Sequence, residues 1–325
     1  MNLKTLATLA TLFLATSAQA ESRQVFAEHQ FSHATPCLIT IVTDSTQEVS
    51  AQNTINTVFA SLDQLDQELG DFPGNTFAQL NSLKKNQTLE LNASVYQLLK
   101  QAAELAALTD GWFDITSPSP KSSFTQRDWR RLSFNDDAHS ITVKSDKMKF
   151  DLTWYLRAHM VDMAIAQLQA AGFSSAQVRI KGISRHVGSD IYGPWNTTVG
   201  LTKTHENSFA HRAYEYQLKS AAAIAFLTPS NLGEQVDAKS KLAIKPQFES
   251  ITVMANDAKH ALAYAIRLAS VDPETALRYL DRQNAAQGFV VDNSGGLWKS
   301  RKLPGVVREV KNSVEEAHET AKTTP

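Results

Sequence analysis

The chain of 325 residues contains a single cysteine, Cys37. One cysteine excludes an intrachain disulfide and any metal site that is built from several thiolates. Cys37 lies in the run PCLITIVTD, which is apolar and rich in β-branched residues. We therefore expect it to be a buried structural thiol and not a nucleophile.

The sequence also lacks an excess of charge and the common catalytic motifs. It has 32 basic and 33 acidic side chains, with no basic block, so nothing in it supports nucleic-acid binding. The nine histidines are dispersed without the spacing of metal ligands. The nucleotide-binding and hydrolase motifs G-x-G-x-x-G, Walker A, G-x-S-x-G and H-E-x-x-H are missing.

An apolar run long enough to cross a membrane is missing as well. The apolar stretch near the N-terminus covers only about residues 6–15, after Lys4 and before the small-residue pattern Ser17-Ala18-Gln19-Ala20. This pattern predicts a secretory signal over residues 1–20 that is cleaved, with no membrane span. The alternative is a membrane anchor, for which the run is too short. The expected location is therefore the periplasm or the exterior, in soluble form.

Helical and strand patterns are mixed along the rest of the chain. They predict an α/β fold of mixed α+β type, with mixed sheets and packed helices in one compact domain over residues 21–304, followed by a polar tail over 305–325. We expect GWFDITSPSP to be a short strand that opens into a loop. Strands are predicted over 24–31, 37–43 and much of 184–230, and helices over 46–69, 94–108, 153–171 and 272–283.

Five stretches occur in an order and spacing that resemble one family. They are ELGDFPGNTFAQLNS, TDGWFDITSPSP, KFDLTWYLRAHMVDMAIAQLQAAGF, PWNTTVG and SITVMANDAKHALAYAIRLAS. The family is ApbE, the periplasmic FAD:protein FMN transferases, and the resemblance covers about residues 25–300. It implies the ApbE fold and an enzyme that cleaves FAD with Mg²⁺ and places FMN on a Ser or Thr of a target protein.

The resemblance also implies candidate residues for a flavin. Phe72 stands where the family has a ring-stacking Tyr. The family's flavin-contacting G-x-F-D-x-T motif matches here, and so do the first and last Asp of its D-L-G-G-I-A-K-G-Y-A-V-D motif, of which Asp162 is expected to orient structure. The expected flavin contacts are therefore Phe72, Trp112, Phe113, Asp114 and Asp151.

The departures from the family motifs concern the phosphate and metal half of the site. Residues 153–158, TWYLRA, replace Gly-Gly-Ile-Ala-Lys-Gly, so that Arg157 is the one candidate for a catalytic cation. Lys181-Gly182 replaces a Gly-Gly pair. His260 and Tyr264 are assigned to the family's metal-binding Asp and Thr, and an imidazole and a phenol are poor ligands for Mg²⁺. We therefore expect FAD or FMN as the ligand, with the Mg²⁺ ligands of the family not kept.

Structural explanations compete with these assignments. Residues 112–114 could be core aromatics beside a turn-capping Asp, and Arg157 and His159 could face solvent on a helix. His260 could be an ordinary surface or core histidine. For the whole chain, we expect an exported flavin-handling protein with weak or no transferase activity, whose partner is an exported flavoprotein or redox protein. The alternative is an active, divergent, Mg²⁺-dependent FAD:protein FMN transferase.

Overall fold

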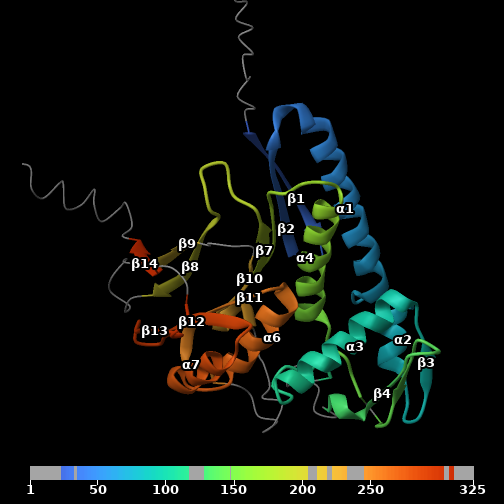
Figure 1. Cartoon of the computed structure of the whole chain (residues 1–325). Coiled ribbons are helices and arrows are strands. Elements are labelled where there is room, and N and C mark those ends of the chain that lie inside the picture. Colours follow the sequence, from blue (N-terminus) through green and yellow to red (C-terminus); the bar gives the residue numbers. More distant parts are fainter. Residues whose placement is uncertain are drawn as a thin grey trace, which may run out of the picture.

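The computed structural model of the chain describes residues 23–32, 35–116, 128–146, 148–203, 211–217, 222–232, 245–303 and 307–310. Within them, the strands form an eight-stranded sheet and two three-stranded sheets, which pack with helices. The strand pairs of the three sheets are antiparallel. The predicted α/β fold is therefore confirmed in its α+β form (Figure 1). The predicted signal over residues 1–20 lies outside the described residues.

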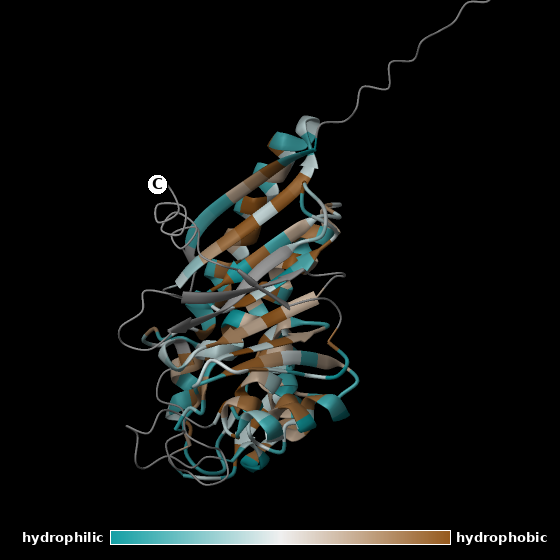
Figure 2. Cartoon of the chain, turned by 90° about the vertical axis from the view of Figure 1, so that its left-hand side faces the viewer, coloured by the Kyte–Doolittle hydropathy of each residue, from teal (hydrophilic) through white to brown (hydrophobic). Residues whose placement is uncertain are grey.

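The central sheet runs in the order β1-β2-β6-β7-β10-β11-β12-β13. On β2, Cys37, Ile39 and Ile41 are fully buried, because alternate residues of a strand point to the same face. Figure 2 shows apolar and polar residues following one another along the strands of the sheet. The strands are β1 (Arg23–Ser32), β2 (Thr35–Asp44), β6 (Ala176–Ile180), β7 (Ile183–Val187), β10 (Ala222–Leu227), β11 (Phe248–Ala255), β12 (Ala286–Asp292) and β13 (Leu297–Lys299).

Three long helices cover one face of this sheet (Figure 1). Helix α1 (Glu48–Leu69) contacts β1 and β2, α4 (Thr153–Ala170) contacts β6 and β7, and α6 (Ala258–Ala269) contacts β10 and β11. Helix α7 (Pro273–Arg282) follows α6 and begins as the sequence predicts, with Asp272 accepting a hydrogen bond from the N–H of Thr275 and Pro273 in the first turn. Together with the sheet, these helices enclose the main hydrophobic core.

A second, smaller unit lies at one end of the helix layer. It contains α2 (Thr76–Ser82), α3 (Ala93–Leu108) and the sheet β3-β5-β4 (Figure 1). The chain enters this unit from the C-terminal end of α1 and leaves it into the N-terminal end of α4. The segments that join the two units therefore contain the predicted site residues around positions 72 and 151–157. The strands of the small sheet are β3 (Thr88–Glu90), β4 (Leu132–Asn135) and β5 (Ser140–Val143).

The opposite face of the central sheet has its own apolar cluster, in which Val42, Trp195 and Phe289 pack together. The third sheet, β14-β9-β8, lies on this side, where β8 contacts β11. Residues 307–310 fall in the predicted polar tail but form its strand β14. The strands are β8 (Asn196–Lys203), β9 (His211–Gln217) and β14 (Val307–Val310), and a short helix, α5 (Pro229–Leu232), follows β10.

Burial raises the pKa of the Cys37 thiol to about 12, which fits the expected structural role of this residue. In the part of the chain that the structure describes, no helix is both long and apolar enough to cross a bilayer.

Candidate functional site

The loop after α1 exposes an aromatic ring. Gly70 ends α1, and a Cβ at this position would lie 2.4 Å from the carbonyl oxygen of Asp66, so only glycine fits. Phe72 follows, with its N–H donating to the carbonyl oxygen of Gly70 at 2.9 Å. Its side chain is 48% exposed, which is unusual for a large apolar residue. Phe72 is therefore free to stack against a planar ligand.

The segment after α3 is a compact turn and not the strand that the sequence suggested. Asp110 and Gly111 both have positive φ, 55° and 75°, which reverses the chain directly after the helix. Thr109 then accepts the N–H of Phe113 through its hydroxyl oxygen at 3.1 Å. The carboxylate of Asp114 accepts hydrogen bonds from both the N–H and the hydroxyl of Thr116, each at 2.8 Å. The sequence predicted a short strand here, but these side-chain caps favour a turn.

The two aromatic side chains of this turn pack against other side chains, Phe113 fully and Trp112 partly buried. Phe113 is 4% exposed and lies 5.8 Å from the ring of Tyr155, measured between centroids. The ring of Trp112 lies 4.2 Å from the guanidinium carbon of Arg267, which is also 5.0 Å from the ring of Tyr279. Both rings thus take part in the fold, and their predicted contact with a flavin stays a prediction.

Asp151 connects the turn after α3 to the start of α4. Its backbone N–H donates to the carbonyl oxygen of Ile115 at 2.7 Å, and its exposed carboxylate accepts the N–H of Thr153 at 3.0 Å. Next to it, Tyr155 is 1% exposed and donates its hydroxyl to the carbonyl oxygen of Leu98 at 3.1 Å. Phenolic and carboxyl groups therefore fix the backbone here, where the family has glycines.

Two cations lie against the indole ring of Trp154, in the first turn of α4. The guanidinium carbon of Arg157 lies 5.4 Å from the ring centroid of Trp154, and the ammonium of Lys181 lies 5.2 Å from it. Arg157 is only 8% exposed, so the alternative that it faces solvent is wrong. Its Nε–H is buried and has no hydrogen-bond acceptor among the described residues. Burial lowers the pKa of Arg157, while the charges of Asp151 and Asp66 act in the opposite direction.

Helix α4 also carries a buried histidine two residues further on. His159 is partly buried, and its Nδ1 has no hydrogen-bond partner in the described part of the chain. Burial and then the nearby charge of Lys259 lower its pKa to about 4. The ring is therefore neutral at physiological pH and does not behave as a solvent-facing histidine.

Asp162 and His260 both form hydrogen bonds at the N-terminal end of α6. The carboxylate of Asp162 accepts the N–H groups of Ala258 at 2.8 Å and Lys259 at 3.2 Å, and the guanidinium of Arg185 at 2.9 Å. This is the structural role expected for Asp162. His260 bonds through Nδ1 to both carboxylate oxygens of Asp257 at 2.8 Å, and this bond raises the pKa of His260.

Tyr264 lies one turn further along α6 and is 2% exposed, with its ring 6.1 Å from that of Tyr279. Burial raises the pKa of its phenol. A buried, protonated phenol and an imidazole that is bonded to a carboxylate have little to offer a magnesium ion, which prefers anionic and carbonyl oxygens.

Comparison with known proteins identifies the fold. The sequence profile of the ApbE family matches residues 33–290. The chain belongs to the ApbE family. No relative was found among the curated proteins compared.

Three ApbE structures share the fold at low sequence identity. The apo form of Pseudomonas stutzeri flavinyl transferase ApbE has a TM-score of 0.71 at 19% identity, covering 91% of this chain and 96% of its own. The ApbE protein of Thermotoga maritima gives 0.70 at 17% identity, with 86% and 97% covered. The flavin transferase ApbE of Vibrio cholerae gives 0.69 at 14% identity, with 91% and 99% covered. The chain therefore shares the fold of these three structures over most of its length.

Membership of ApbE permits a closer count along its last motif, V-T-V-x-A-x-x-A-x-x-A-D-A-x-x-T. Starting the motif at Ile251 places its Asp on Leu262 and its Thr on Ile266. The assignment of His260 and Tyr264 to these positions was therefore shifted by two residues. Starting at Ile251 also matches all four alanines of the motif, to Ala255, Ala258, Ala261 and Ala263.

The residues at the ApbE metal positions do not fit Mg²⁺. Leu262 is fully buried in the core, and Ile266 packs against it. Hydrocarbon side chains offer no donor atoms to a hard cation. Across the described ranges, no group of three or more His, Cys, Asp or Glu side chains could hold a metal ion.

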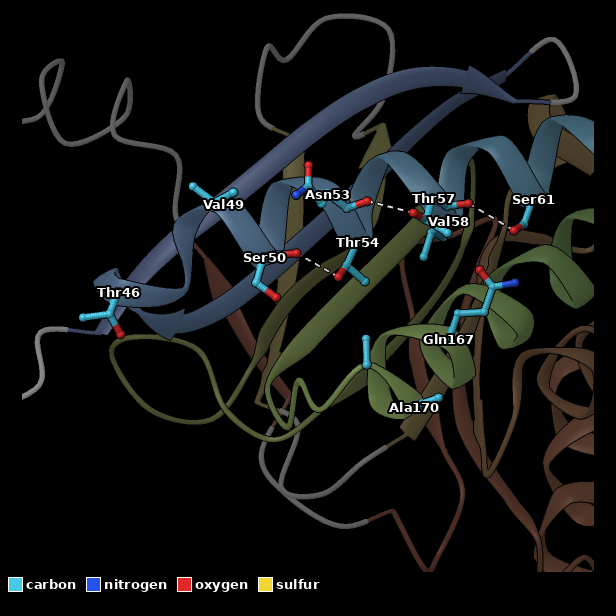
Figure 3. A pocket seen from close by; sticks show the side chains of 11 residues that line it. Thr46, Val49, Ser50, Asn53, Thr54, Thr57, Val58, Ser61, Gln167 and Ala170 are labelled. Carbon is cyan, nitrogen blue, oxygen red and sulfur yellow. Dashed lines mark hydrogen bonds between the residues drawn. The ribbon is translucent and has the colours of Figure 1, made fainter.

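A groove lies elsewhere, between the N-terminal half of α1 and the C-terminal end of α4 (Figure 3). Its volume is about 800 Å³, and Gln167 and Ala170 line it from α4. Ala170 lies about 20 Å along α4 from Arg157, because a helix rises 1.5 Å per residue. None of the candidate residues lines this groove. Its hydroxyls donate to their own helix one turn earlier, as Thr54 does to Ser50, Thr57 to Asn53 and Ser61 to Thr57.

The structure thus brings Asp114, Asp151 and Arg157 to one junction between the two units, and places His260 in the first turn of α6, near Asp162. The sequence marked Lys181 as a departure from the family but could not place it against Trp154. The sequence signal was Lys181 itself, a cation at a position where the family has a Gly-Gly pair. The separation of the two residues by a helix and a strand hides their contact.

Proposed function

We propose that this ApbE protein binds a flavin nucleotide and has weak or no FAD:protein FMN transferase activity. The observation that carries the proposal is Arg157, a residue that is only 8% exposed and whose buried Nε–H lacks an acceptor among the described residues. A buried, unsatisfied donor costs stability, and a ligand phosphate would satisfy it. Arg157 also occupies the position of the conserved lysine in the family motif.

Exposed Phe72 and the Asp114 turn support a flavin as the ligand. Phe72 offers an exposed ring in the loop after α1. The family's F-D-x-T turn is intact in sequence and is capped by hydrogen bonds to Asp114. The proteins with the same fold are named as flavin transferases, which makes the isoalloxazine ring the expected partner of Phe72. In this proposal, Phe72 contacts the ring and Arg157 contacts the phosphate.

The loss of transferase activity follows from the metal positions. A divalent ion would neutralise the phosphates while the phosphoanhydride bond of FAD is broken. Leu262 and Ile266 cannot hold that ion, so we propose binding without efficient transfer.

We also propose export to the periplasm or exterior, which rests on the N-terminal signal pattern. The proposed partner there is a flavoprotein or redox protein.

Flavin titration and a turnover assay test the proposal together. We expect the fluorescence of FAD and FMN to be quenched on binding. We expect FAD to stay intact when Mg²⁺ and a flavin-acceptor protein are present. Release of AMP at a rate well above background would support the alternative, an active divergent transferase. The absence of binding by both FAD and FMN would refute the proposal.

A further inference from the structure

Arg157 and Lys181 form a pair of cations that the fold holds together. The two residues come from the first turns of α4 and from the β6–β7 turn, and α4 packs directly on both strands. Both charges lie within 5.4 Å of the ring centroid of Trp154. They are close enough that the charge of Arg157, after the effect of burial, lowers the pKa of Lys181.

The positions of Arg157 and Lys181 are both energetically unfavourable. Arg157 is buried with its Nε–H unpartnered, as described above, and a guanidinium in this state is destabilising. Lys181 has a φ of 53°, in the left-handed region that glycine adopts easily and lysine does not. The family has glycine there. A strained lysine that is directed at a buried arginine makes structural sense if an anion lies between or beside them.

The metal positions point the same way. Leu262 and Ile266 remove the cation that phosphates require in this family, whereas Lys181 adds a cation where the family has none. A phosphate would therefore meet positive charge at Lys181 and not at the metal positions. Arg and Lys both bind phosphate, the first by paired N–H groups and the second as a point charge.

We infer that Arg157 and Lys181, flanking Trp154, form a phosphate-binding site that works without a divalent metal. The ligand class is a phosphomonoester or diphosphate, and, resting on the proposed function, the phosphate group of FMN or FAD. Lys181 is a residue that determines specificity in this site, because it favours phosphorylated flavin over the uncharged vitamin. Two negative groups, Asp151 and Asp66, lie close enough to Arg157 to raise its pKa against the effect of burial.

Binding of three probes in EDTA and in Mg²⁺ tests the inference. The probes are FMN, riboflavin and inorganic pyrophosphate, measured by calorimetry on the whole mature chain. We expect FMN to bind at least tenfold more tightly than riboflavin, with the same ratio in EDTA and in Mg²⁺. A ratio that disappears in EDTA would show that a metal carries the phosphate contact and would overturn the inference.

Lys181→Gly is the decisive variant, because glycine fits the positive φ and the protein should stay folded. We expect it to weaken the affinity for FMN about tenfold and to leave the affinity for riboflavin unchanged. Lys181→Arg should restore most of the FMN affinity. Lys299→Gly, an exposed lysine on the distant edge strand β13, is the matched control and should change neither ligand. Equal weakening of FMN and riboflavin by Lys181→Gly would overturn the inference.

Failure of the proposed function gives a different result. If no flavin binds but pyrophosphate binds and is lost in Lys181→Gly, the cation pair is supported and the flavin proposal falls. If FMN and riboflavin bind equally, the flavin proposal survives and the phosphate site is refuted. If pyrophosphate and FMN both fail to bind, the phosphate site is refuted as well.

Discussion

Arg157 and His159 are polar residues inside a helix whose neighbours are apolar. Arg157 is buried beside Trp154, and His159 has a ring nitrogen without a partner. Residues of this kind reduce the stability of the free protein and are retained where a ligand uses them. The sequence identified Arg157 through the family motif, but burial decided between a ligand-binding and a solvent-facing side chain, and burial depends on tertiary packing.

The first prediction concerns Arg157→Met, which removes the buried charge and keeps the volume. Because an unpaired buried cation is destabilising, we expect the unfolding free energy to stay the same or to rise, by up to about 2 kcal/mol. FMN affinity should fall in the same protein. Urea denaturation and FMN titration measure the two effects. A loss of several kcal/mol in stability would show that Arg157 has a structural partner and not a ligand.

The second prediction concerns acid and His159. Its pKa is about 4 in the folded protein and about 6.5 in the unfolded chain, so between these values only the unfolded chain binds the proton. Its contribution to stability is therefore complete above pH 6.5 and is lost as the pH falls towards 4. Relative to His159→Gln, the unfolding free energy of the natural protein should fall by up to about 3 kcal/mol over this interval.

Urea denaturation at pH 7, 5.5 and 4.5 checks the effect of His159. His29→Gln, on the exposed side of strand β1, is the matched control and should follow the natural protein at every pH. Parallel curves for the natural protein and His159→Gln would contradict the buried, neutral state of this ring.

At the scale of the elements, the turn at residues 109–116 shows where a reading of the sequence succeeds and where it fails. The long helices α1, α3 and α4 were predicted close to their observed bounds, because periodicity over several turns is a strong signal. The turn was taken for a strand, since GWFDIT has β-forming residues. Its fold depends on side-chain caps by Thr109 and Asp114, and local propensity does not report such caps.

The third prediction separates the structural from the ligand role of Asp114. Its carboxylate accepts hydrogen bonds from the N–H and hydroxyl of Thr116 and from the N–H of Trp129 at 3.2 Å. Asp114→Ala leaves these donors without their acceptor and should cost about 1–3 kcal/mol in the absence of any flavin. Asp137→Ala, an exposed aspartate in the β4–β5 turn, should cost less than about 0.5 kcal/mol. A stable Asp114→Ala protein that has lost only flavin affinity would refute the structural role.

At the scale of the whole molecule, family motifs gave the fold, but contacts between distant segments were beyond the sequence. Lys181 and Trp154 lie on different elements, and only the packing of α4 on β6 and β7 brings them together. The metal positions were assigned two residues away from the places that the motif's own alanines fix. Order and spacing of motifs therefore establish family and architecture, whereas the chemistry of the site required the coordinates.

The fourth prediction concerns the stability of the whole chain, which a single cysteine reports. Cys37 is fully buried on strand β2 of the central sheet, and burial raises its pKa to about 12. A thiol reagent should therefore label Cys37 only when the central sheet opens, and the labelling rate should rise in parallel with global unfolding in urea. A Lys299→Cys variant provides an exposed thiol that should react at once. Rapid labelling of Cys37 in the native protein would contradict the closed core.

The most direct test of the account is a crystal structure of the mature chain with FMN, grown in EDTA. We predict the phosphate in contact with both Arg157 and Lys181 and the isoalloxazine ring against Phe72, with no metal ion at the phosphate. FMN bound in the groove between α1 and α4, or with its phosphate held by a metal ion away from Lys181, would contradict it.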